Sequence, residues 1–385
     1  MWVATARLLL EDAVPDSLAL PRVDIDATFG AELVEDARRY ERFLVIDWIV
    51  AQVVLLAVLW VYAKRGVRFI AQSAAGRIGT GMMLGMLGLG IVWLVQLPFG
   101  AAALWWERRH DTTEIGYLEW AFGDWLALGA SFLAISLALL IVMALAGWLR
   151  EWWWIPGAGA FVAIAALLTF VSPYLVETKP LGDAGLVQAA REYEREQGIG
   201  EIPLRVEEVS GDTSDANAYA TGLGPTRRVI LWDTLIDGRF DDGAERTVIA
   251  HEVAHHSSRH LPKSLAWFGM FALPAAWLLM RLTRRRGGMQ APEAVPLALL
   301  VVAVIQLVAA PFQSAISRSM EMEADWKALT STRDPEGARE LFVGFAETGL
   351  GDPSPPGWQQ LLLGTHPTLA DRVAMAEAWK VMRTP

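Results

Sequence analysis

Six long runs of apolar residues constrain the fold of this chain more than any other feature. A bilayer core about 30 Å thick needs roughly 20 apolar residues in a helix. The windows that meet this requirement are residues 43–63, 82–106, 122–149, 152–176, 261–282 and 292–317. Few charges lie inside them, and tryptophans gather at their edges, as in an interfacial aromatic belt. We therefore predict a multi-span α-helical membrane protein.

The composition agrees with a membrane protein and narrows the chemistry. Of the 385 residues, 54% are hydrophobic and 20% charged, against about 45–50% and about 25% in ordinary soluble domains. The absence of cysteine excludes a thiolate zinc site and a cysteine nucleophile, so a metal would need His and carboxylate ligands. The net charge of −10 argues against a nucleic-acid partner, because phosphate binding needs a basic face.

Four glycines of the second window have spacings that let helices approach closely, namely Gly81, Gly85, Gly88 and Gly90. We interpret them as helix-packing positions rather than as functional residues.

Two polar stretches, 177–260 and 318–385, are together long enough for one small domain. Helical periodicity is present at 184–197, 244–260, 320–329, 335–348 and 368–382, and short β-branched or apolar runs at 204–209, 218–221 and 229–232 predict strands. The soluble part is therefore predicted to be α+β and split across the chain. The predicted order is a polar N-terminal segment (1–42), four spans (43–176), the first soluble part (177–260), two spans (261–317) and the second soluble part (318–385).

The sharpest motif in the chain is His251-Glu252-Val253-Ala254-His255. Helix positions i and i+4 share a face, so His251 and His255 can aim one ring nitrogen each at the same metal ion. Glu252 lies about 100° further round the helix, where it can reach a metal-activated water without being a ligand. The alternative is a pair of surface histidines on an amphipathic helix.

A catalytic zinc usually takes three protein ligands and leaves a fourth position for water. The best candidate for the third is in segment 317–325, because two spans return the chain to the same side of the membrane. Glu321 and Asp325 are four residues apart and share a helix face, whereas Glu323 points nearly opposite. We assign Glu321 to the metal and Asp325 to a hydrogen bond with a ligand histidine. The remaining pair, His256 and His260, is expected to have surface or helix-end roles.

These residues resemble the membrane-embedded zinc metallopeptidases of the Ste24 and HtpX type, peptidase family M48. Three further blocks match in order: 214–219 with 228–235 as a strand pair before the zinc helix, 317–325 as the third-ligand motif, and Thr365-His366-Pro367 with Arg372 as the C-terminal motif. A polar helix at 31–42 leading into four spans is similar to the Ste24 branch, which has seven spans against the six predicted here.

The resemblance implies a zincin-like (gluzincin) catalytic domain with one Zn²⁺ bound by His251, His255 and Glu321, and Glu252 as the general base. It also implies that the spans enclose a water-filled chamber.

The remaining residues that the resemblance assigns contact the substrate. Those implied to lie on an edge strand beside an extended substrate are Asn217, Ala218 and Tyr219. His366 and Arg372 are implied to face the cleft, and His366 is our candidate donor to the oxyanion.

We interpret the chain as an integral-membrane zinc endopeptidase that cleaves membrane-associated or lipidated peptides. One alternative is an HtpX-like enzyme of membrane-protein quality control, and a different class is a zinc-binding sensor or scaffold with vestigial cleavage. Glu252 argues against the scaffold, because metal binding alone does not need a carboxylate at that position. The expected partners are a peptide or protein substrate and the lipid bilayer.

Two lines of reasoning disagree on which side of the membrane the catalytic domain lies. The positive-inside rule favours an extracytoplasmic domain, because nine Lys and Arg flank the spans at the opposite end and five at its own: 64, 65, 68, 77, 150, 281, 284, 285 and 286 against 38, 39, 42, 108 and 109. The resemblance implies a cytoplasmic domain, in the cell membrane or, in a eukaryote, an ER-type membrane, and we follow it.

Overall fold

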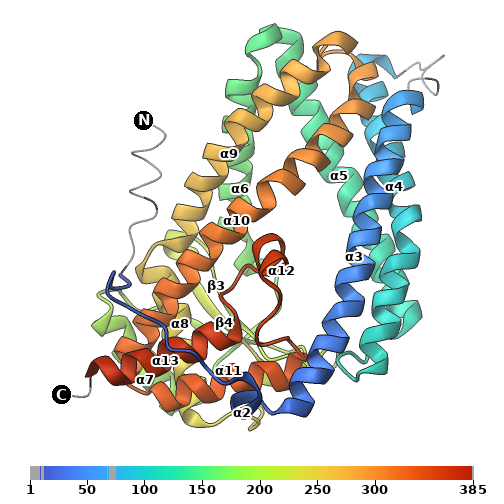
Figure 1. Ribbon diagram of the computed structural model, residues 1–385. Helices are drawn as coiled ribbons and strands as arrows, with labels where there is room; N and C mark the ends of the chain where they lie inside the picture. Colours follow the sequence, from blue (N-terminus) through green and yellow to red (C-terminus); the bar gives the residue numbers. More distant parts are fainter. Residues whose placement is uncertain (1–8, 10–12, 67, 69–74, 384–385) are drawn as a thin grey trace.

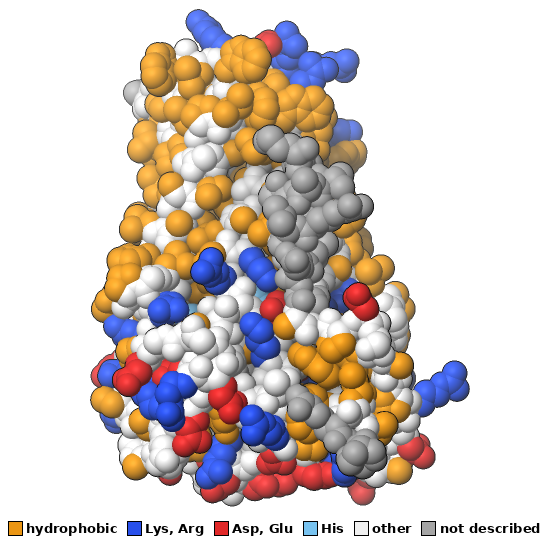
Figure 2. Space-filling model, turned by 90° about the vertical axis from the view of Figure 1, so that its left-hand side faces the viewer, with side chains coloured by type: hydrophobic (Ala, Val, Ile, Leu, Met, Phe, Trp, Pro, Cys, Tyr) orange, Lys and Arg blue, Asp and Glu red, His pale blue; other side chains and the backbone are white. Residues whose placement is uncertain are grey.

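The computed structural model describes residue 9 and residues 13–66, 68 and 75–383. Six of its helices are long and apolar enough to cross a membrane, which confirms the predicted multi-span architecture. Figure 1 shows these helices extending away from a smaller lobe that contains the sheet and the C-terminal helices. Figure 2 shows apolar side chains over the upper part of one face, charged side chains gathered over the lower part, and Lys and Arg at the far upper end.

The six membrane helices are α3 (Ala31–Arg65), α4 (Gly76–Arg109), α5 (Tyr117–Leu149), α6 (Trp154–Val171), α9 (His260–Thr283) and α10 (Val295–Thr332). Along the chain α3 packs on α4, α4 on α5, and α6 on α9, while α10 packs on both α9 and α3. A short helix, α2 (Ile25–Phe29), precedes the first of them. The polar helix predicted at 31–42 is continuous with the first span, so that α3 runs from the bilayer into the soluble lobe.

Close helix packing explains the glycines of α4. A Cβ atom at Gly81 would lie 2.3 Å from Met143 Sδ, and one at Gly85 would lie 2.5 Å from a Leu139 methyl, both on α5. A Cβ atom at Gly88 would lie 2.5 Å from a Leu299 methyl of α10 and 2.8 Å from the Tyr62 ring of α3. Gly88 therefore sits where three membrane helices meet.

The soluble lobe contains a four-stranded sheet of order β1-β2-β4-β3. Its strands are β1 (Lys179–Pro180), β2 (Leu204–Glu207), β3 (Ala218–Thr221) and β4 (Arg228–Trp232). β2 and β4 are parallel, and β3 pairs antiparallel with β4, which leaves β3 at the edge. The three predicted strands are present, whereas the two-residue β1 was not predicted because it is too short to show alternation.

The soluble lobe also contains α7 (Ala184–Glu196), α8 (Asp242–Ser257), α11 (Pro335–Gly349), α12 (Gly357–Leu362) and α13 (Leu369–Arg383). Short 3₁₀ turns connect the longer elements: η2 (Arg150–Trp152), η3 (Ser172–Tyr174), η4 (Gly224–Thr226), η5 (Asp233–Leu235), η6 (Arg284–Arg286) and η7 (Pro292–Ala294). α8 is the central element of the lobe, because it packs on α7, α10, α11 and β3. Its first turn is capped by Asp241, whose side chain accepts a hydrogen bond from Ala244 N at 2.7 Å.

Two helix boundaries differ from the sequence-based expectation. The helix predicted at 244–260 ends at Ser257, because Arg259 adopts a left-handed conformation (φ +57°) and α9 starts at His260. In contrast, the boundary predicted between 317 and 318 falls inside α10, which runs unbroken for 38 residues. The hydropathy changes there but no helix-breaking residue intervenes, so a single helix carries Glu321 from the bilayer into the soluble lobe.

We predict that Gly88→Val lowers the thermal unfolding midpoint of the detergent-solubilised protein. Overpacking of a close helix contact costs about 1–3 kcal/mol, and both neighbours of the new side chain lie on other helices. Gly90→Val is the matched control, since its Cβ would meet only Phe132 at 3.7 Å. Equal midpoints for the two variants would contradict the packing role of Gly88.

Candidate active site

The His251-Glu252-x-x-His255 motif lies on the most buried helix of the soluble lobe. His251 and Glu252 are 6% and 5% exposed, and potential ligand atoms of His251, Glu252 and His255 all lie within 4.8 Å of one another. The helix is fixed on both sides, because apolar residues such as Ile249 and Val253 belong to the same core as the strands. The two imidazoles share one face, as the spacing predicted.

Glu321 of α10 reaches this face from a different part of the chain. Its Oε2 lies 3.1 Å from His251 Nε2, its Oε1 lies 3.5 Å from His255 Nε2, and the two Nε2 atoms are 3.0 Å apart. Bonds of about 2.0–2.1 Å in a tetrahedral arrangement place neighbouring ligand atoms roughly 3.3 Å apart. The three groups therefore fit one tetrahedral metal ion, with a fourth position left for water.

Asp325 lies one helical turn beyond Glu321 and contacts the other nitrogen of the same imidazole. His251 Nδ1 and Asp325 Oδ1 are 2.8 Å apart, which fixes a proton on Nδ1 and frees Nε2 for a metal. The carboxylate is almost fully buried, and Arg372 compensates its charge through two hydrogen bonds of 2.8 and 2.6 Å. The Arg372 guanidinium also lies over the Phe342 ring at 4.2 Å.

The pKa values of the two imidazoles shift in opposite directions. Burial lowers the pKa of His255 to about 3, which keeps its ring neutral. Burial also acts on His251, but hydrogen bonds to Asp325 and Glu321 outweigh it and raise the pKa of His251 to about 10. A divalent cation would replace the proton shared between His251 and Glu321.

Glu252 faces the sheet. Burial raises the pKa of Glu252 to about 7, and the nearby Glu321 adds to the shift, while the backbone N–H of Ala220 on β3 opposes it. A carboxyl group whose pKa lies near neutrality can both accept and return a proton.

Two buried residues near His255 were not assigned to the site from the sequence. His260 Nδ1 lies 2.9 Å from His255 Nδ1, and His260 Nε2 lies 3.1 Å from Glu323 Oε2. His260 lies at a helix end, as one of the two expected roles, because α9 begins there, but it is 3% exposed and so is not a surface residue. The left-handed residue Arg259, which turns the chain back after α8, could not be foreseen from periodicity alone.

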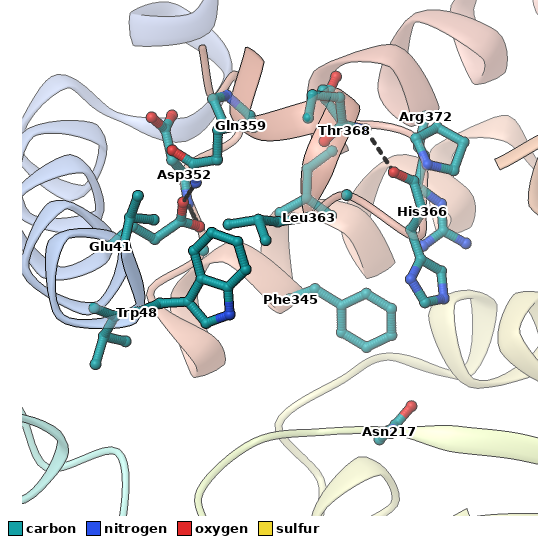
Figure 3. Close-up of a pocket in the computed structure, with 18 of the residues that line it drawn as sticks. Glu41, Trp48, Asn217, Phe345, Asp352, Gln359, Leu363, His366, Thr368 and Arg372 are labelled. Atoms are coloured by element: carbon teal, nitrogen blue, oxygen red, sulfur yellow. Dashed lines mark hydrogen bonds between the residues drawn. The ribbon is translucent and has the colours of Figure 1, made fainter. Parts of the chain in front are cut away.

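A cavity of about 760 Å³ opens beside the histidine cluster. Figure 3 shows Trp48 of α3 pointing into it, opposite Phe345 and Leu363. His366, whose side chain is largely exposed, also lines it, with Nε2 3.4 Å from Glu321 Oε2. The cavity therefore leads from a membrane helix to the candidate metal ligands.

The segment that carries His366 is held from two sides. Glu41 of α3 accepts hydrogen bonds from Asp352 N (2.7 Å) and Gln359 Nε2 (2.6 Å). Arg318 of α10 donates from Nη1 to the carbonyls of Gln360 (2.8 Å) and Gly364 (2.6 Å). Asp352 is buried because of these contacts.

The edge strand β3 presents alternate backbone groups to the cleft. Trp232 N donates to Asn217 O, so pairs 217/232, 219/230 and 221/228 bond within the sheet, while Ala218 and Ala220 direct N–H and C=O outward. The Asn217 side chain accepts from Ala218 N at 2.8 Å and lines the cavity. Tyr219 lies on the edge strand as expected, but its hydroxyl donates to Glu207 across the sheet and its backbone pairs with β4.

The site combines one helix that carries two histidines and a glutamate, a carboxylate from a second helix, and a strand edge beside a cavity. Together with the apolar helices, these features define a membrane-embedded metallopeptidase. The family model described as "Peptidase family M48" matches residues 186–380, and the chain belongs to this family. It is a membrane metalloprotease with a Ste24-like architecture.

Several named relatives agree with this assignment. An "Uncharacterized metalloprotease YhfN" of Bacillus subtilis is 26% identical over 86% of this chain and 80% of its own length. A "CAAX prenyl protease 1 homolog" of Taenia solium is 22% identical over 84% and 79%, and a "Protease HtpX homolog" of Acidiphilium cryptum is 27% identical over 62% and 94%. The crystal structure of S. mikatae Ste24p superimposes with a TM-score of 0.71 at 18% identity, covering 97% of this chain and 94% of the other.

We predict that Arg372→Met destabilises the protein by about 3–5 kcal/mol, because it leaves the buried charge of Asp325 without its partner. The thermal unfolding midpoint measures this effect. Arg333→Met is the control, since Arg333 forms an exposed pair with Glu196 that contributes about 0–1 kcal/mol. If Arg372 instead binds substrate, as the sequence suggested, the midpoint stays unchanged and KM for a peptide rises.

Proposed function

We propose that this protein is a zinc endopeptidase in which His251, His255 and Glu321 bind the metal and Glu252 is the general base. The observation that carries the proposal is the convergence of one carboxylate and two imidazole nitrogens within 3.5 Å of one another, next to a buried glutamate. Nitrogen and carboxylate ligands with one open position are typical of catalytic zinc. The ion, when bound, polarises the scissile carbonyl and acidifies a water in the site.

Each of the chain's own groups has one step in this proposal. Glu252 accepts the proton of the attacking water and passes it to the leaving amine. Asp325 holds His251 in the tautomer that frees Nε2, and Arg372 positions Asp325. His366 lies beside Glu321 in the cavity lining, where its Nε2–H can donate to the developing oxyanion.

The substrate is proposed to be an extended peptide from a membrane-associated protein. Such a peptide can add a strand to β3, with the outward carbonyls of Ala218 and Ala220 as acceptors, since their N–H groups already donate to Asn217 Oδ1 and to Glu252. The adjoining cavity is lined on one side by Leu44, Val45 and Trp48 of α3, which favours apolar substrate residues. One wall of the cavity is thus formed by a membrane helix. This arrangement favours substrates delivered from the bilayer over soluble proteins.

Cleavage of lipidated peptides is the finer proposal, and the "CAAX prenyl protease" names of relatives support it. Quality control of membrane proteins is the second candidate, supported by relatives named "Protease HtpX homolog". Two of those relatives match 42% and 43% of this chain, whereas the Ste24p structure covers 97% of it. The extended match favours the Ste24-like proposal.

We predict that Glu252→Gln abolishes peptide cleavage while the purified enzyme keeps one zinc per chain. Removing a general base lowers the rate by about 10²–10⁴-fold or more, but the three proposed ligands stay in place. Cleavage of a fluorogenic peptide and elemental analysis measure the two effects. His251→Ala is the reference variant, which should lose both zinc and activity. Retained cleavage by Glu252→Gln would refute the mechanism.

We also propose that the catalytic lobe faces the cytoplasm. The excess of basic residues at the opposite end argues against this orientation, but several of them have structural partners. Arg286 donates to Ala63 O, Arg150 to Gln290, and Arg284 pairs with Glu151. Those arginines join helix ends, and they need not report the orientation of the chain.

Because the chain contains no cysteine, single cysteines can test the orientation directly. We predict that Val381→Cys, at an exposed site of the catalytic lobe, is protected from a membrane-impermeant maleimide in intact cells, whereas Arg285→Cys at the other end is labelled. Both should react in permeabilised cells. The reverse pattern would place the catalytic lobe outside.

A further inference from the structure

The second candidate ligand, His255, has an unusual partner on the side away from the metal face. Its Nδ1 lies 2.9 Å from His260 Nδ1, and His260 Nε2 lies 3.1 Å from Glu323 Oε2. His260 and Glu323 are 3% and 5% exposed. A buried row of three groups therefore leads from the metal face of α8 to a carboxylate of α10.

Proton accounting fixes the tautomer of each ring. The Glu323 carboxylate only accepts, so His260 Nε2 carries a hydrogen, and a neutral His260 then has a lone pair on Nδ1. That lone pair accepts the hydrogen on His255 Nδ1, which leaves His255 Nε2 unprotonated. This is the nitrogen that lies 3.0 Å from His251 Nε2 and 3.5 Å from Glu321.

The fold holds this row in place at both ends. Glu323 is fixed by Ser258 Oγ at 2.9 Å and by the ammonium groups of Lys263 and Lys327 at 3.4 and 3.6 Å. His260 is turned toward His255 by the left-handed residue Arg259. The geometry therefore depends on the break between α8 and α9, which the sequence did not reveal.

We propose that His260 and Glu323 are positioning residues that act on the metal through His255. His260 and Glu323 set the tautomer and orientation of His255. The buried Glu323 carboxylate also polarises the row, which makes the lone pair of His255 Nε2 a stronger metal ligand. His251 receives the same support from Asp325 directly, whereas His255 receives it through a second imidazole. The inference rests on the proposed function only in taking His255 as a metal ligand.

Zinc affinity of the purified full-length protein tests the proposal without recourse to activity. Competition with a chromogenic chelator gives Kd for wild type, His260→Ala, Glu323→Gln and the double variant. Loss of such an outer hydrogen-bond partner weakens metal binding about 10–100-fold. Since Glu323 acts through His260, the double variant should bind zinc no more weakly than His260→Ala alone.

The control is His256→Ala. His256 is also buried on α8, but its Nε2 bonds to Arg228 O rather than to a ligand histidine. Its removal should lower the thermal midpoint of the zinc-free protein and leave Kd within about twofold of wild type. Wild-type affinity in His260→Ala, or additive losses in the double variant, would overturn the proposal.

A measurement on the unaltered protein covers the case in which the variants do not fold. In ¹⁵N-histidine-labelled zinc-bound enzyme, the nitrogen spectra should show His260 protonated at Nε2 and not at Nδ1. A hydrogen on His260 Nδ1 would overturn the proposal, because this nitrogen could then not accept the hydrogen of His255 Nδ1. Failure of the proposed function is a separate outcome, in which His255→Ala retains wild-type zinc affinity.

Discussion

The structure depends on the approach of α10 to α8, because this contact brings Glu321 and Asp325 to the two histidines of the motif and Glu323 to His260. Glu321, Glu323 and Asp325 lie within five residues of one helix, and all three are buried. Burying three negative charges together is expensive unless each has a partner. Here each has a different one: Asp325 has Arg372, Glu323 has two lysines and His260, and Glu321 has the two ligand imidazoles.

This division of partners gives Glu321 a special position. Asp325 and Glu323 are neutralised by cations of the chain itself, whereas the groups around Glu321 are imidazoles and the partly exposed His366. Its charge is therefore the one that a divalent cation would balance. The fixed pairs on either side keep the carboxylate from drifting, since α10 cannot rotate without separating Asp325 from Arg372. The metal face is thus preorganised by ion pairs that take no part in binding the metal.

The fold and the metal face could largely be predicted from the sequence, because both follow from periodicity. The six spans and the pairing of His251 with His255 depend only on helical spacing, and the i+4 relation of Glu321 and Asp325 correctly placed them on one face of α10. The structure brings these residues together, and their roles stay proposals.

The features that sequence reasoning missed depend on single backbone conformations or on packing between distant segments. The turn at Arg259 decides whether His260 continues α8 or folds back on it, and no composition signal marks an arginine with positive φ. The helical spacing predicts that Glu323 points away from the site. Its carboxylate does point away from the three candidate metal ligands, but it contacts His260. Tyr219 lies on the predicted strand. Which of its residues direct their backbone groups toward β4 depends on the pairing register of β3 and β4, and the sequence of β3 alone does not give that register.

The contacts of the 352–368 segment explain why the membrane helices and the catalytic groups form one unit. Glu41 on α3 holds the start of this segment, and Arg318 on α10 holds its end next to His366. Both residues lie on helices that run out of the bilayer, so a relative movement of α3 and α10 would pull on the segment from two sides. The cavity is lined by α3 on one side and by His366 on another, and the position of His366 depends on contacts with the two membrane helices as well as on the soluble lobe.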